Sequence, residues 1–171
     1  TVGDISRGHA ADRPDKVELI CVDRSWTYAE LDRESHQAAN ALSAAGVSAG
    51  DRVAFLDKNA PEYFSFLIGA GKINAVTVAV NWRLAPPEME YILDNAEAKV
   101  LLIGEEFLGH LSKMNLTTVT TIIVLGEGGE HPSFDGWFAG HSADDPAVPS
   151  AEDDTCYQLY TSGTTGLPKG V

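Results

Sequence analysis

The chain has 171 residues, of which 44% are hydrophobic, and a formal net charge of −13. This length and composition suffice for one folded core and argue against a disordered chain. The negative charge repels a polyphosphate backbone at long range, so we expect no nucleic-acid partner. The sequence has no run of about 18 apolar residues, which a transmembrane helix would need, and its first 15 residues lack an apolar signal core. We therefore expect a cytoplasmic protein.

The first 50 residues predict a region unlike the rest of the chain. Its opening elements are a helix at 2–11, a strand at 17–22 and an extended segment at 25–27. Thr27 and Glu30 then match the T-x-x-E capping box, and an alanine-rich helical pattern follows until Gly46, a natural helix stop. We therefore treat residues 1–50 as one unit, separate from the remainder.

Residues 51–171 alternate between short apolar strands and helical segments. The predicted strands are 53–56, 75–80, 100–103, 120–125 and 156–160. The predicted helices are 61–73, 86–93, a helix within 105–114 and a short helix near 134–138. This alternation predicts an α/β fold, a mostly parallel sheet with helices on both faces. The segment 140–154 is rich in Asp, Pro, Ser and Ala and predicts an exposed connection.

The segment 160–170 has the composition of a loop that wraps phosphate. Its glycines let backbone N–H groups approach an anion, its hydroxyl groups add donors, and Lys169 adds a positive charge. The candidate phosphate-binding residues are Thr161, Ser162, Gly163, Thr164, Thr165, Gly166 and Lys169. The spacing differs from the P-loop, because Pro168 stands where that motif has its second glycine. The alternative is a Ser/Thr/Gly surface loop without a ligand.

Three segments carry a family resemblance. Tyr160–Val171 closely resembles the phosphate-binding signature of the adenylate-forming enzymes, which include acyl-CoA synthetases, aryl-CoA ligases, luciferases and peptide-synthetase adenylation domains. Trp26–Leu31 resembles the early T-Y-x-E-L element of that family, and Gly50–Val53 resembles its G-D-R-V turn and strand. The resemblance therefore runs through the whole chain.

A fourth segment, Ala70–Leu84, resembles the family stretch K-x-G-A-V-x-V-P-x-N-x-R-L with two departures. Asn74 replaces the usual glycine, and Ala79 replaces the usual proline. Both positions belong to a predicted helix end and buried strand. We expect altered packing or pocket shape there, and no loss of chemistry.

The resemblance implies ATP-dependent activation of a carboxylic acid, of the fatty type, to acyl-AMP and transfer to coenzyme A. ATP, Mg²⁺ and coenzyme A are the implied cofactors and co-substrate. The loop 161–166 would hold the β- and γ-phosphates with Lys169 as counter-charge, and Thr161 or Thr164 would contact the magnesium ion.

In the resembled family, the acid pocket and the catalytic lysine lie beyond the position of Val171. We therefore expect no catalytic residue here, an incomplete part of the large amino-terminal domain, and no activity from these residues alone. In that family the region 1–50 packs with a later subdomain. Transfer to a carrier protein, an aryl acid, or a non-catalytic nucleotide-binding module remain the alternatives.

Other candidate residues are weaker. Arg83 could orient a phosphate or carboxylate, but a loop-pinning role beside Trp82, covering apolar surface, is favoured. The acidic runs 105–106 and 152–154 lack metal-site spacing, and the five histidines lack a zinc pattern. Cys21 and Cys156 have no C-x-x-C spacing, so we expect reduced thiols packed in or near strands.

Overall fold

A five-stranded parallel sheet forms the centre of the chain. The structure is a computed structural model and describes residues 1–161 and 167–171. The strands are β3 (Arg52–Leu56), β4 (Val76–Ala79), β5 (Ala98–Gly104), β6 (Thr121–Leu125) and β7 (Tyr157–Gln158). They lie in the order β6-β5-β3-β4-β7, and every neighbouring pair is parallel. The predicted α/β class with a mostly parallel sheet is confirmed.

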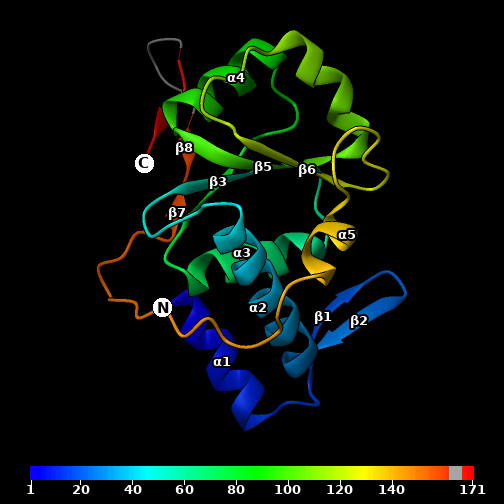
Figure 1. Cartoon of the computed structure of the whole chain (residues 1–171), viewed down its shortest axis with the longest axis vertical. Coiled ribbons are helices and arrows are strands. Elements are labelled where there is room, and N and C mark those ends of the chain that lie inside the picture. Colours follow the sequence, from blue (N-terminus) through cyan, green and yellow to red (C-terminus); the bar gives the residue numbers. More distant parts are fainter. Residues whose placement is uncertain (162–166) are drawn as a thin grey trace.

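Helices cover both faces of this sheet (Figure 1). On one face lie α2 (Tyr28–Ala44), α3 (Glu62–Lys72) and α5 (Phe134–Ala139). On the other lie α4 (Pro86–Asn95) and η1 (Glu105–Lys113). The predicted helix within 105–114 is confirmed, and η1 is of the 3-10 type. It begins after Gly104 without a side-chain cap.

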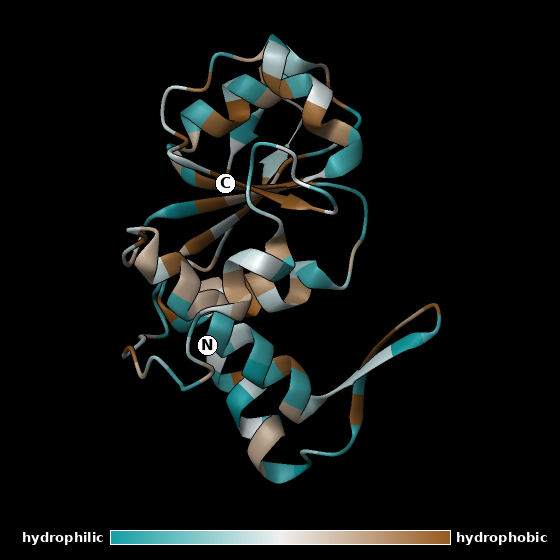
Figure 2. Cartoon of the chain, turned by 45° about the vertical axis from the view of Figure 1, so that its right-hand side comes forward, coloured by the Kyte–Doolittle hydropathy of each residue, from teal (hydrophilic) through white to brown (hydrophobic). Residues whose placement is uncertain are grey.

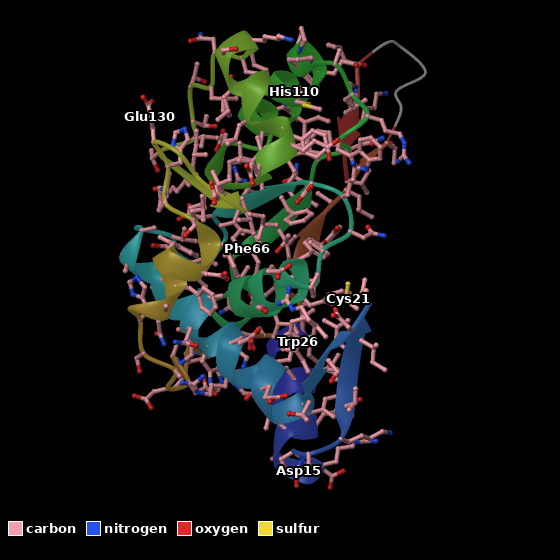
Figure 3. All side chains as sticks on the ribbon, turned by 90° about the vertical axis from the view of Figure 1, so that its right-hand side faces the viewer. Asp15, Cys21, Trp26, Phe66, His110 and Glu130 are labelled. Atoms are coloured by element: carbon pink, nitrogen blue, oxygen red, sulfur yellow. The ribbon has the colours of Figure 1, made fainter. Side chains whose placement is uncertain are left out.

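Alternate residues of each strand build two separate cores, because successive side chains of a strand point to opposite faces. In β3, Val53 and Phe55 pack with α2 and α3, whereas Ala54 and Leu56 pack with α4 and η1. Phe66 of α3 is fully buried in the first of these cores, in the interior of the molecule (Figure 3). No helix among the described residues is long and apolar enough to cross a bilayer.

The amino-terminal elements lie outside the main sheet. They are α1 (Val2–Asp12) and the antiparallel strands β1 (Val17–Cys21) and β2 (Arg24–Thr27). Figure 2 shows this hairpin projecting from the body of the molecule, with hydrophobic residues near its free end. Ile20 and Val22 are 72% and 93% exposed.

Cys21 is half-buried, but Cys156 is exposed just before β7, so the expected packing of that thiol is wrong.

Helix α2 begins with the predicted capping box. The Thr27 hydroxyl accepts a hydrogen bond from the Glu30 amide (3.2 Å) and Glu30 accepts one from the Thr27 amide (2.8 Å), which confirms that prediction.

Helices α2 and α3 approach each other closely. A Cβ atom built at Gly69 of α3 would lie 2.8 Å from the Cβ of Ala38 on α2. The glycine and the alanine-rich face of α2 therefore permit this short distance.

A polar network joins α1, α2 and α3 to the predicted connection 140–154. The Lys72 ammonium lies 2.5 Å from the Asp32 carboxylate, which also accepts from the Ser6 hydroxyl at 2.5 Å. Arg7 of α1 binds Asp145 of the connection through two hydrogen bonds, of 2.5 and 2.8 Å. The connection therefore follows the surface of the amino-terminal helices at fixed contacts.

Candidate functional site

The segment leading into the candidate phosphate loop is divided in two. We predicted one strand over 156–160, but only β7 joins the parallel sheet, beside β4. The chain then forms β8 (Tyr160–Thr161), which pairs antiparallel with β9 (Lys169–Gly170). The single strand is therefore a wrong prediction. Residues 169–170, which follow the loop, pair with the second half of the predicted strand and form a hairpin stem. The composition of residues 156–160 does not distinguish this pairing from a place in the main sheet.

The stem brings the two ends of the candidate loop together. Thr161 lies opposite Lys169 in the β8–β9 register, and both residues are exposed. Within residues 1–161 and 167–171, neither side chain forms a hydrogen bond or ion pair. A hydroxyl and an ammonium group are thus exposed on facing strands of the stem. The other predicted residues, Ser162, Gly163, Thr164, Thr165 and Gly166, lie outside the described residues.

A cavity of about 450 Å³ opens at the carboxyl edge of the sheet, between β3 and β4. The connection after β3 leads to α3 on one face, and the connection after β4 leads to α4 on the other. Such a reversal is the topological switch point at which ligands of open α/β sheets bind. The switch-point cavity is lined by Phe55, Asp57, Asn59, Ala60, Tyr63, Phe64, Ala79, Val80, Asn81, Trp82 and Tyr157.

The lining of the switch-point cavity is mostly apolar, with few polar groups. The hydroxyl groups of Tyr63 and Tyr157 lie 2.6 Å apart and share a hydrogen bond. Burial raises the pKa of Tyr63 well above its usual range, so this phenol stays neutral. Burial also raises the pKa of Asp57. An apolar wall with a few fixed polar groups is typical of small-molecule sites.

Arg83 follows Trp82, a lining residue of this cavity, and forms no ion pair with a carboxylate among the described residues. Its guanidinium carbon is 4.0 Å from the centre of the Trp82 ring, and Lys58 lies over the same ring at 5.4 Å. The predicted loop-pinning contact is made by the Arg83 backbone, whose N–H donates to Asn81 at 3.0 Å. The Arg83 side chain itself makes no hydrogen bond among the described residues, so the loop-pinning role predicted for it is wrong. Trp82 is half-buried against the α4 face, as predicted.

A second cavity, of about 530 Å³, lies at the base of the β8–β9 stem. Gly170, Gln158 and Arg52 contribute to its wall. The Arg52 guanidinium donates to the carbonyl groups of Gly50 and Ala96 and binds the Glu97 carboxylate at 2.8 Å. These partners engage all three nitrogen atoms of the guanidinium, so Arg52 serves the fold.

The weaker acidic candidates do not form a metal site in the described part of the chain. Glu105 accepts a hydrogen bond from the Glu127 amide at 3.1 Å, and the run 152–154 is exposed. Sequence reasoning missed the contact between Tyr160 of the stem and Asn95 of α4, where hydroxyl and amide oxygen lie 2.7 Å apart. The two residues are 65 positions apart, and no local pattern signals their contact.

Comparison with known proteins decides the family. The sequence profile of the AMP-binding enzymes matches residues 7–171. The chain belongs to this family. Its resemblance to adenylate-forming enzymes is therefore confirmed, and the strands and helices described above are the amino-terminal elements of the AMP-binding fold.

Relatives within the AMP-binding family differ in substrate. The chain is 44% identical to a fatty acid–[acyl-carrier-protein] ligase, ScoC, of Streptomyces coeruleorubidus, over 95% of this chain and 31% of that protein. It is 38% identical to a 3-hydroxybenzoate–CoA/4-hydroxybenzoate–CoA ligase of Thauera aromatica, over 98% of this chain and 33% of that protein. The chain thus spans about a third of the length of the curated relatives that it matches.

Solved structures show the same backbone. The chain superimposes on an anthranilate CoA ligase, AuaEII, in complex with anthranoyl-AMP, with a TM-score of 0.94 and 35% identity, covering 99% of this chain and 34% of that one. It superimposes on a fatty acyl CoA synthetase of Mycobacterium tuberculosis with a TM-score of 0.90 and 32% identity, over 99% and 34% of the two chains.

Proposed function

We propose that the enzyme containing this chain uses ATP to convert a carboxylic acid to an acyl-AMP and then transfers the acyl group to a thiol. A carboxylate is a poor acyl donor, because its leaving group would be oxide. Attack on the α-phosphorus of ATP releases pyrophosphate and gives the acyl group a good leaving group. Membership of the AMP-binding family over residues 7–171 is the observation that carries this proposal.

The residues at the mouth of the loop fit this chemistry. Negative charge accumulates on pyrophosphate as it leaves, and preorganised cations and hydrogen-bond donors stabilise such charge. Lys169 and Thr161 are exposed on facing strands and have no partner within the described part of the stem. We assign Lys169 to the β- and γ-phosphates. Thr161 is our candidate for a contact with the Mg²⁺ that accompanies ATP, which neutralises phosphate charge when bound.

For the substrates, we propose a fatty acid and coenzyme A. A fatty acid is supported by similarity to a fatty acid ligase of Streptomyces coeruleorubidus and to a fatty acyl CoA synthetase of known structure. A second candidate acceptor is an acyl carrier protein, which the name of the 44% identical relative favours. A second candidate acid is aromatic, because the hydroxybenzoate ligase of Thauera aromatica is 38% identical.

Acid-dependent exchange of pyrophosphate into ATP tests the activation step in the enzyme containing this chain. We expect exchange with medium- or long-chain fatty acids and little with 3-hydroxybenzoate. Formation of acyl-CoA, compared with acylation of a carrier protein bearing its thiol arm, then distinguishes the acceptors. Absence of exchange with every fatty and aromatic acid would contradict adenylation.

Substitution of Lys169 tests the role of the loop. Lys169→Ala should raise the KM for ATP or lower kcat by at least tenfold, because charge-assisted contacts to phosphate are among the stronger hydrogen bonds. Lys113→Ala is the matched control, because Lys113 is an exposed lysine at the end of η1, away from the stem. Unchanged exchange kinetics in Lys169→Ala would remove the assigned role.

A further inference from the structure

The β8–β9 stem is joined to helix α4 through one side chain. The Tyr160 hydroxyl donates to the amide oxygen of Asn95 at 2.7 Å, and it accepts from the Gln158 side chain at 3.2 Å. Asn95 is the last residue of α4. Both distances lie in the normal range for their hydrogen bonds. One phenol thus uses its donor and an acceptor position to connect a helix end to the stem.

The backbone of the stem is shaped for this phenol. A Cβ atom at Gly170 would lie 3.1 Å from Cζ and 3.2 Å from the hydroxyl oxygen of Tyr160, and 2.6 Å from the Gln158 amide nitrogen. The ring therefore lies directly across the glycine of the opposite strand. Its other side packs against the core between the sheet and α4. Any side chain at position 170 would displace Tyr160 or Gln158.

Helix α4 is itself a fixed support. Its side chains Met89, Ile92 and Leu93 are at most 2% exposed in the core beneath it. Burial raises the pKa of Tyr160, so its hydroxyl keeps the proton that it donates to Asn95. The contact therefore connects a short exposed hairpin to a helix whose apolar side chains are held in the core.

We infer that Tyr160 and Asn95 are positioning residues for ATP: their hydrogen bond fixes the stem, and with it Thr161 and Lys169, against α4. This inference rests on the proposed function. Neither residue needs to touch the nucleotide. A tether of this kind acts on phosphate binding through the placement of the neighbouring residues, and it leaves the site of the acid unaffected.

Steady-state pyrophosphate exchange in the enzyme containing this chain tests the inference. Tyr160→Phe and Asn95→Ala should each raise the KM for ATP about 2- to 10-fold, the effect of one lost neutral hydrogen bond, with the KM for the acid unchanged. Asn95→Asp keeps an acceptor oxygen and should restore the wild-type KM for ATP. Because both partners act through one bond, the double variant should be no worse than the worse single variant.

Tyr91→Phe is the matched control, since Tyr91 is the tyrosine of α4 itself and its hydroxyl makes no hydrogen bond among the described residues. It should leave the KM for ATP unchanged. A KM for ATP that stays within experimental error in both Tyr160→Phe and Asn95→Ala would overturn the inference. So would additive effects in the double variant, or equal rises in the KM values for ATP and acid, which a general loss of structure produces.

The two proposals fail differently. A wild-type enzyme without any acid-dependent exchange removes the proposed function, and the inference with it. Wild-type exchange combined with unaffected variants removes the inference alone. Thermal unfolding of each variant completes the comparison, because the positioning role predicts a change in the KM for ATP at an almost unchanged unfolding temperature.

Discussion

The ammonium group of Lys72 lies 2.5 Å from the carboxylate of Asp32, and the Lys72 side chain is fully buried. The same nitrogen also donates to the Asp32 carbonyl group at 3.3 Å. The pair joins α2 to α3, and the Ser6 hydroxyl adds α1. Three helices thus meet around one buried charge pair.

Removal of one partner should destabilise the protein strongly. Lys72→Met leaves the Asp32 carboxylate buried without a counter-charge, and we expect a loss of about 3–5 kcal/mol in the free energy of unfolding, measured by urea denaturation. The double variant Lys72→Met/Asp32→Leu should recover most of this loss, because no unpaired charge remains. Lys113→Met on the surface is the control. A loss below about 1 kcal/mol for Lys72→Met would show that the charge is not held in the core.

The close contact of α2 and α3 predicts an unfavourable glycine substitution. Gly69→Ala should cost about 1–3 kcal/mol, because the new methyl group would lie 2.8 Å from Ala38 and from the Ser35 carbonyl oxygen. Gly8→Ala in α1 is the control, since a Cβ there meets no atom within 4 Å. It should gain up to about 1 kcal/mol from helix propensity. Equal effects of the two substitutions in thermal unfolding would contradict the packing argument.

The ion pair of Arg7 and Asp145 predicts a dependence of stability on acid pH. The Arg7 guanidinium holds the pKa of Asp145 well below its ordinary value. A carboxyl group with a lowered folded-state pKa stabilises the fold above its unfolded-state pKa, about 3.9, and this contribution is lost as the pH falls further.

Comparison with Arg7→Met measures this contribution. The difference in unfolding temperature between wild type and Arg7→Met should be largest above about pH 5 and should shrink steadily below about pH 4. Asp153→Asn, at an exposed position, should show no such trend. A difference that grows on acidification would reverse the sign and refute the assignment.

The departure from the family pattern at Asn74 has a local explanation. Asn74 has a φ of +57°, in the left-handed region that glycine adopts freely and asparagine tolerates, and its amide donates to the Pro149 carbonyl group at 2.5 Å. Asn74→Gly should change stability by less than about 1 kcal/mol, because relief of backbone strain offsets the lost hydrogen bond. Asn74→Ala loses the bond and keeps the strain, and should cost about 1–3 kcal/mol. Equal unfolding temperatures for the two variants would contradict this account.

Most of the sheet could be predicted from sequence, because runs of Val, Ile and Leu between helical segments specify strands locally. The stem could not, since the pairing of Tyr160 with Gly170 depends on a chain reversal whose residues carry no strand pattern. The burial of Lys72 was equally hidden, because lysine is ordinarily exposed and its partner Asp32 lies 40 positions away. Motif resemblance indicated the candidate loop, whereas the contact between Tyr160 and Asn95 is visible only in the structure.

Strand β7, which precedes the β8–β9 stem, is the shortest strand of the main sheet. Only two residues of β7 pair with β4, at one border of the sheet, whereas the opposite border, β6, pairs through five. Local opening of a protein begins where few backbone bonds must break. Amide hydrogens of β7 should therefore exchange with solvent far sooner than those of β3 or β5, so this border of the sheet opens while the interior strands stay paired.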